Sequence, residues 1–171
     1  TAWEGYIEIP ALIMSGYLTI FKEIEESLHS VLEQNLDIVF LQAGVGSMAA
    51  AGVYYYLNKY GSQKPNIVIV EPEEADGILH SFQNNKLLTS KGNSKTIMAG
   101  LNCATPSLGA WDLLKNGTDY SLKIKDKYAK QAVRELYFPI GSDRRIISGE
   151  SGAAGFAGFI ALMNESELKI I

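Results

Sequence analysis

The sequence predicts an α/β fold of three layers, in which helices cover both faces of a doubly wound, mostly parallel sheet. Short runs of branched apolar residues alternate along the chain with amphipathic or alanine-rich segments, the order that builds β-α-β units. The runs at residues 38–41 and 66–70 show little polar alternation, as expected of strands buried on both faces. In such sheets, ligands bind beyond the carboxyl ends of the strands.

The segment from residue 10 to residue 30 predicts the first helix. Pro10 suits a first helical turn, where its missing N–H costs nothing. Apolar residues recur at steps of three and four, the period of one helix face: Leu12, Ile13, Tyr17, Ile20, Phe21, Ile24 and Leu28. Charged residues occupy the other side: Lys22, Glu23, Glu25 and Glu26. We expect the apolar set to face the core and the charged set to face solvent.

The remaining elements follow from the same alternation. Strands are expected over 38–41, 66–70, 95–99, 120–124 and 145–147, and helices over 47–59, 75–84, 107–115, 126–135 and 151–163. Gly61 and Gly117 are typical helix stops, and Asp126 is expected to cap the helix that it opens. Four residues follow strand ends and are expected to line one crevice: Gly44, Glu71, Gly100 and Ser148.

Composition excludes several classes of protein. The chain has 171 residues and a net charge of −4, with no basic stripe, so nucleic acid is not an expected partner. No run of about 18 apolar residues is present, so no membrane span is expected. A single cysteine, Cys103, allows no internal disulfide and fits a reducing, cytoplasmic compartment. With one cysteine and two histidines, no metal-ligand set is expected.

Both ends of the sequence suggest a piece of a longer polypeptide. The chain opens at Thr1 without an initiator methionine, and it closes at Ile170-Ile171 in what reads as the first residues of a strand. A half-made strand leaves backbone groups without partners. We therefore expect a fragment, with a complete chain ending in a short edge strand as the alternative.

The most informative segment is the turn at residues 42–48. A strand ends there in Gln42-Ala43-Gly44-Val45-Gly46-Ser47-Met48 and an alanine-rich helix follows. Glycines let the backbone approach an anion closely, and the free amides and dipole of a helix N-terminus favour negative charge. The segment predicts a site for a phosphorylated small molecule.

Two interpretations of this turn remain open from the residues alone. Residues 44–49 fit the G-x-G-x-x-G/A pattern of dinucleotide-binding domains, and Glu71 follows the next strand near the position of a ribose ligand. That interpretation leaves the later glycine- and serine-rich segments unexplained. A site for pyridoxal 5′-phosphate (PLP) is the other interpretation.

Four segments together resemble the PLP-dependent enzymes of the tryptophan synthase β type, also called fold type II. They are the turn at 42–48, Val68-Ile69-Val70-Glu71-Pro72, Thr96-Ile97-Met98-Ala99-Gly100-Leu101 and Ile147-Ser148-Gly149-Glu150-Ser151-Gly152-Ala153-Ala154. Within this group the chain is most similar to the diaminopropionate ammonia-lyases, through Thr1-Ala2-Trp3-Glu4-Gly5-Tyr6, Glu8-Ile9-Pro10 and Ala99-Gly100-Leu101-Asn102-Cys103. The motifs occur in family order over nearly the whole chain.

The resemblance implies a function. Such an enzyme uses PLP to eliminate ammonia from 2,3-diaminopropionate in amino-acid catabolism, and it releases pyruvate and ammonia. Residues 1–171 would then form the C-terminal part of the enzyme, mostly its large, cofactor-binding domain. The small domain and the Schiff-base lysine would lie in an absent N-terminal half, so this chain carries no catalytic residue and is expected to be inactive alone. An amino-acid substrate and a homodimer are also implied.

The resemblance also implies site residues. Gly44, Val45, Gly46, Ser47 and Met48 would hold the cofactor phosphate. Ser148 would place a neutral hydroxyl at the pyridine nitrogen, with an N-cap of the following helix as the alternative role. Cys103 is expected to be a small buried side chain, or else to lie near the cofactor. The role of Glu71 is open among a ribose ligand, a group behind the PLP site and a strand-end cap.

Three rival functions remain. A serine or threonine dehydratase has the same fold and a different leaving group. A dinucleotide-binding Rossmann domain would bind NAD and ignore PLP. A non-enzymatic phosphate-binding remnant would keep the turn without the catalysis.

Overall fold

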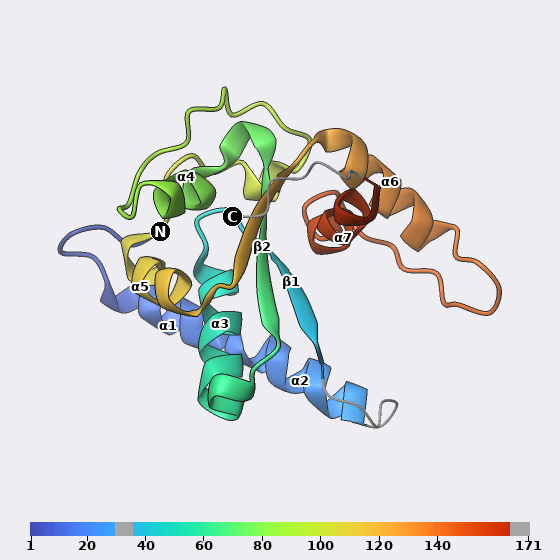
Figure 1. The fold of residues 1–171 in the computed structure, drawn as a ribbon, viewed down its shortest axis with the longest axis horizontal. Helices are drawn as coiled ribbons and strands as arrows, with labels where there is room; N and C mark the ends of the chain where they lie inside the picture. The colour runs from blue at the N-terminus through green and yellow to red at the C-terminus, as the bar shows by residue number, and fades with distance from the viewer. Residues whose placement is uncertain (30–35, 165–171) are drawn as a thin grey trace.

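The computed structural model describes residues 1–29 and 36–164, which form three layers around a parallel sheet (Figure 1). The strands are β1 (Ile38–Gln42), β2 (Asn66–Pro72) and β3 (Tyr120–Ile124), hydrogen-bonded in the order β1-β2-β3. Phe40 pairs with Val68 in the first ladder, and Val70 pairs with Leu122 in the second. Helices cover both faces, so the doubly wound α/β fold is confirmed.

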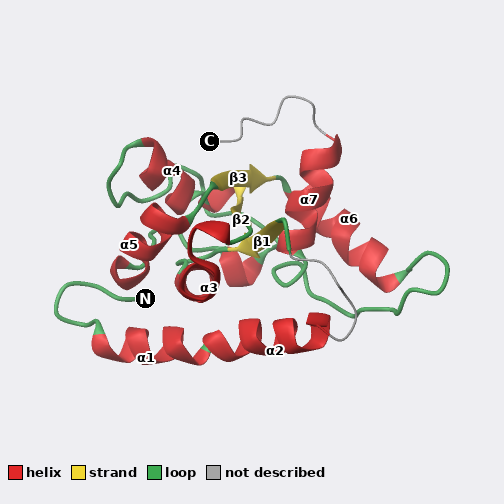
Figure 2. Ribbon diagram, turned by 60° about the horizontal axis from the view of Figure 1, so that its bottom comes forward, coloured by secondary structure: helices red, strands yellow, loops and turns green. Residues whose placement is uncertain are grey.

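Seven α-helices surround the sheet in the described part of the chain. They are α1 (Glu8–Gly16), α2 (Leu18–His29), α3 (Ser47–Tyr60), α4 (Gly77–Gln83), α5 (Leu108–Gly117), α6 (Asp126–Tyr137) and α7 (Ala154–Asn164). Helices α3 and α5 lie on one side of the sheet, and α6 and α7 lie on the other (Figure 2). Helices α1 and α2 pack outside α3. None of these helices is long and apolar enough to span a bilayer.

The central strand β2 divides the apolar core into two clusters. Ile67 and Ile69 point toward α3, α4 and α5, whereas Val68 and Val70 point toward α6 and α7. Both faces of β2 are therefore buried, which explains its run of branched residues without polar alternation. Small residues let the helices pack closely on the sheet. A Cβ atom at Gly158 of α7 would lie 2.6 Å from Val70 Cγ2 of β2.

The first predicted helix differs from the structure in three ways. It is two helices, α1 and α2, which meet at Tyr17. Glu25, expected on the solvent face, is buried, and its carboxylate accepts hydrogen bonds from Tyr55 (3.0 Å) and Tyr60 (2.5 Å) and pairs with Lys59. Three donors on α3 compensate the carboxylate for its lost water. Part of the expected core face is instead exposed: Leu12, Ile13, Ile20 and Ile24.

Two predicted strands do not form. Residues 95–98 are irregular, and Ala99 begins the 3₁₀-helix Ala99–Leu101. Instead of a neighbouring strand, Asp126 accepts from Thr96 Oγ1 at 2.6 Å and from the Ile97 amide at 3.1 Å. Asp126 is thus the first residue of α6 and not its cap. Residues 145–147 form an exposed segment tied to α6 by a bond from the Ile146 amide to the Leu136 carbonyl. The strand expected at the end of the sequence lies outside the described residues.

Candidate functional site

The turn between β1 and α3 requires glycine at Gly46. Its φ of +91° lies in the left-handed region, which disfavours residues with a Cβ. A Cβ there would also lie 2.7 Å from Leu114 Cδ1 and 3.1 Å from Ile78 Cδ1. The turn therefore packs directly against α5 and α4, and only a glycine at position 46 allows so close a contact.

The backbone amides of this turn are available to a ligand. The N–H groups of residues 44–48 meet no backbone acceptor among the described residues, as is usual at the start of a helix. The Val45 carbonyl accepts the Ser107 amide at 2.8 Å, and the Gly46 carbonyl accepts the Ala50 amide at 2.8 Å. With these carbonyls fixed, the free amides of the turn stand at the positive end of the α3 dipole.

A cleft of about 170 Å³ opens over the turn. Its lining comes from three parts of the chain: Tyr17, residues 42–49, and the group Gly100, Leu101 and Cys103. The walls are close, since a Cβ at Gly44 would lie 3.2 Å from the Gly100 carbonyl oxygen and 3.3 Å from Cys103 Sγ. The described lining contains no carboxylate, so no negatively charged side chain there repels an anion.

The structure brings together most of the predicted site residues. Five of them line the cleft as one continuous turn: Gly44, Val45, Gly46, Ser47 and Met48. Gly100 is also in the lining, as expected from its place in the sequence. Ser148 is not part of this lining, and its hydroxyl donates to the Gly149 carbonyl at 3.1 Å. Its assignment to the pyridine nitrogen stays a prediction.

Ser151 is the serine of this segment that reaches the cleft wall. Its Oγ accepts the Gly100 amide at 2.9 Å and so ties the start of α7 to the 99–101 turn. Glycine- and serine-rich composition pointed to the segment, but only the fold distinguishes the two serines. Tyr17 was missed as a lining residue, because its spacing places it among the apolar residues of the first predicted helix.

Substituting Ser151 by alanine is expected to lower the free energy of unfolding by about 1 kcal/mol, because the Gly100 amide loses its acceptor. Ser148→Ala serves as the control, since the Ser148 hydroxyl bonds only to the adjacent residue's carbonyl. Urea titration of both variants measures the difference. Equal losses would show that the Ser151 bond adds nothing to stability.

Glu71 lies below the cleft and not in it. The side chain is fully buried at the end of β2, and its carboxylate accepts the amides of Ile78 and Leu79, each at 2.8 Å. It therefore caps α4, and its complete burial removes the ribose-ligand alternative. Burial raises the pKa of Glu71 to about 8, although the two amides act in the opposite direction.

This pKa predicts a pH dependence of stability. A carboxyl whose pKa rises from 4.5 in the unfolded chain to about 8 in the fold binds its proton more tightly when folded. Its stabilising contribution is complete below pH 4.5 and is lost as the pH rises to about 8, with a slope of at most about 1.4 kcal/mol per pH unit. Urea titrations across this window, repeated with Glu71→Gln, measure it; equal slopes for the two proteins would contradict the assignment.

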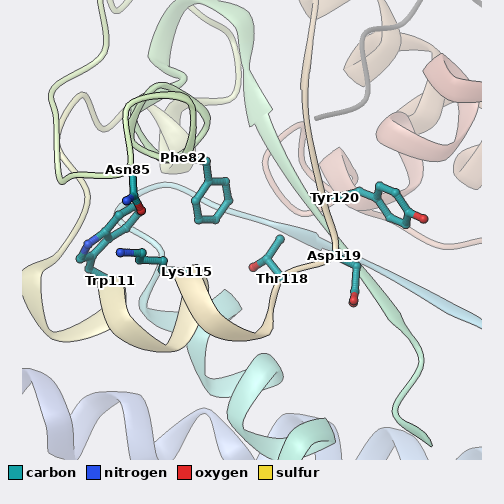
Figure 3. Close-up of a pocket in the computed structure, with 7 residues that line it drawn as sticks. All are labelled: Phe82, Asn85, Trp111, Lys115, Thr118, Asp119 and Tyr120. Atoms are coloured by element: carbon teal, nitrogen blue, oxygen red, sulfur yellow. The ribbon is translucent and has the colours of Figure 1, made fainter. Parts of the chain in front are cut away.

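A second hollow, of about 270 Å³, lies near the amino end of strand β3 (Figure 3). It is lined by Phe82, Asn85, Trp111, Lys115, Thr118, Asp119 and Tyr120. Phe82 and Trp111 stack with centroids 5.6 Å apart. Because Tyr120 begins β3, this hollow is at the amino ends of the parallel strands and is separate from the cleft over the turn.

Fold and turn together define an α/β protein in which a turn with free backbone amides lies at the carboxyl ends of parallel strands. Residues 3–170 match the family model of pyridoxal-phosphate dependent enzymes. The chain therefore belongs to that family, which confirms the resemblance found in its motifs and overturns the dinucleotide-binding interpretation of the turn.

Within this family, the chain is similar to diaminopropionate ammonia-lyases in both sequence and structure. Diaminopropionate ammonia-lyase of Escherichia coli strain K12 is 40% identical over 162 residues, which are 95% of this chain and 40% of that protein. The crystal structure of the Escherichia coli enzyme in complex with an aminoacrylate-PLP azomethine reaction intermediate matches with a TM-score of 0.89 and 38% identity, covering 98% of this chain and 42% of that one. The chain thus spans about two fifths of the length of these relatives.

A third match is to a structure with much lower sequence identity. The processed form of threonine deaminase isoform 2 from Solanum lycopersicum matches with a TM-score of 0.73 at 20% identity, covering 85% of this chain and 39% of that structure. At this identity the match supports the shared fold alone.

Proposed function

We propose that this chain forms the phosphate-binding part of a PLP-dependent lyase that converts 2,3-diaminopropionate to pyruvate and ammonia. The observation that carries the proposal is the turn at residues 44–48, with free amides and a carboxylate-free cleft, in a chain 40% identical to a diaminopropionate ammonia-lyase. Because the chain spans two fifths of that relative, the activity belongs to a longer polypeptide.

The residues present fit the phosphate group of this cofactor. A phosphate needs several N–H donors converging on one point and a backbone without side chains in the way. Gly44 and Gly46 leave the approach clear, and the amides of residues 44–48 are without backbone acceptors among the described residues. No lysine or arginine lines the cleft, so the amides and the α3 dipole hold the anion.

The turn at residues 44–48 and Ser148 then have distinct roles toward the cofactor. When bound, PLP supplies the electron sink for a carbanion at the substrate α-carbon. Gly44, Val45, Gly46, Ser47 and Met48 bind and orient the phosphate, and the Ser47 hydroxyl adds a donor. Ser148 is proposed to face the pyridine nitrogen with a neutral hydroxyl, which does not enforce a protonated ring and suits elimination. Among the described residues no lysine lines the cleft, and the lysine that binds the cofactor is proposed to come from outside this chain.

The remaining assignments extend the same proposal. The described residues would form most of the large, cofactor-binding domain, and the chain would be the C-terminal part of a homodimeric enzyme acting on an amino acid. A cytoplasmic location is supported by the single cysteine of the chain.

The test is an activity assay of the whole reading frame that encodes this chain. Purified protein with PLP is given 2,3-diaminopropionate, serine or threonine, and release of pyruvate or another 2-oxo acid is followed over time. We expect PLP-dependent pyruvate release that favours 2,3-diaminopropionate. Preference for serine or threonine would favour a dehydratase of the same fold. No release and no bound cofactor would leave a phosphate-binding remnant.

A further inference from the structure

We infer that Glu71 is a positioning residue of the phosphate-binding turn: it fixes the first turn of α4, which holds Ile78 against Gly46. The identity of the ligand rests on the proposed function, whereas the mechanical connection is a property of the chain itself. No contact between Glu71 and the cleft is needed, since α4 lies between them.

The first step is the capping of α4 from a distance. Glu71 accepts the amides of both Ile78 and Leu79 at 2.8 Å, which are two of the four donors that a helix start leaves without partners. The carboxyl group is fixed in place, because Glu71 pairs with Lys123 of β3 and its side chain is completely buried. The start of α4 is thereby fixed to the sheet.

The second step leads from α4 to the turn. Ile78 is completely buried, and its Cδ1 lies 3.1 Å from the point where a Cβ of Gly46 would stand. Leu114 Cδ1 is closer still, at 2.7 Å from the same point. Gly46 is therefore held between α4 and α5, and displacement of α4 removes one of its two supports.

A second route reaches the other side of the same turn. A Cβ at Gly77 would lie 2.5 Å from the Ala104 carbonyl oxygen, so the start of α4 packs directly on the 103–107 loop. The last residue of that loop, Ser107, donates its amide to the Val45 carbonyl at 2.8 Å. Val45 and Gly46, two neighbours in the turn, thus both depend on where α4 begins.

Two charged groups face Glu71, and both are engaged. Asp76 and Lys123 pair at 2.8 Å, and Asp76 also accepts the Ser90 hydroxyl at 2.6 Å. Neither takes the place of Glu71 at the α4 amides. Without the two carboxyl oxygens of Glu71, neither group offers a replacement acceptor to these buried amides.

The test uses the whole reading frame that encodes this chain, with Glu71→Gln as the variant and Glu73→Gln as the matched control. A glutamine offers one oxygen to two amides and directs an NH₂ group at the other. Hydrogen exchange of the ligand-free protein is read at the Ala50 and Ser107 amides, which are bonded to Gly46 and Val45. PLP affinity is measured by titration.

We expect Glu71→Gln to accelerate exchange at both amides at least tenfold and to weaken PLP binding at least tenfold, while amides in the middle of α6 keep their protection. Glu73→Gln should behave as the wild type. Faster exchange within α4 alone, with Ala50, Ser107 and PLP affinity unchanged, would overturn the inference. If the wild type binds no PLP but the exchange result holds, the proposed function fails and the positioning role stands.

A second variant covers the case in which Glu71→Gln does not fold. Ile78→Val removes the Cδ1 atom that supports Gly46 and leaves the amides of α4 and Glu71 untouched. Faster exchange at Ala50 with weaker PLP binding would support the inference. Wild-type exchange and affinity in this variant would contradict it, because the contact through Ile78 would then have no effect on the turn.

Discussion

Gly46→Ala is expected to lower the free energy of unfolding by about 2–5 kcal/mol and to abolish detectable PLP binding. A non-glycine residue at a φ of +91° costs on the order of 1–3 kcal/mol. Crowding against Leu114 and Ile78 adds about 1–3 kcal/mol, although the Leu114 side chain can relieve part of it. Urea denaturation and PLP titration of the whole protein measure the two effects.

The variant Gly5→Ala is a control that separates the effect of backbone strain from that of side-chain crowding. Gly5 has a similar φ of +82°, but a Cβ there would meet nothing within 4 Å. We expect this control to lose stability through strain alone and to bind PLP normally. If Gly46→Ala loses no more stability than Gly5→Ala and retains PLP affinity, the turn is not held as tightly as the structure indicates.

Ser47→Asp is expected to stabilise the fold slightly and to weaken PLP binding. Ser47 is the first residue of α3, where a carboxylate favours the helix by about 0.3–1 kcal/mol. The same carboxylate would stand about 4 Å from a bound phosphate and repel it by about 4 kcal/mol per pair of unit charges at an effective dielectric constant of about 20. We therefore expect PLP affinity to fall more than about 100-fold in a protein at least as stable as the wild type.

The neutral variant Ser47→Asn tests whether charge is the cause. It matches aspartate in size, so a loss of affinity close to that of Ser47→Asp would point to steric exclusion. A protein that binds PLP equally well with aspartate at this position would show that the phosphate lies elsewhere.

Those parts of the fold that depend on local sequence were predictable. The strands β1, β2 and β3 and the turn before α3 follow from apolar runs and from glycines whose spacing sets the local backbone. The same holds for the five consecutive residues proposed to bind the cofactor, since one turn brings them together.

Several of the incorrect predictions share one physical cause, which is a partner distant in sequence. Residues 95–99 have strand-like composition, but Asp126, some 30 residues later, accepts their hydrogen bonds. Glu25 has the pattern of a solvent-facing residue, and donors from α3 make its burial tolerable. The bond from the Gly100 amide to Ser151 and the place of Tyr17 in the lining also depend on packing between elements that the sequence does not place relative to one another.

The most direct test of the account compares the affinities of PLP and of pyridoxal, which lacks the phosphate, for the wild type and for Ser47→Asp in the whole protein. If the turn at residues 44–48 holds the phosphate, the wild type binds PLP far more tightly than pyridoxal, and Ser47→Asp removes most of that difference. An unchanged preference for PLP in the variant would contradict the account, because the phosphate would then be bound by another part of the protein.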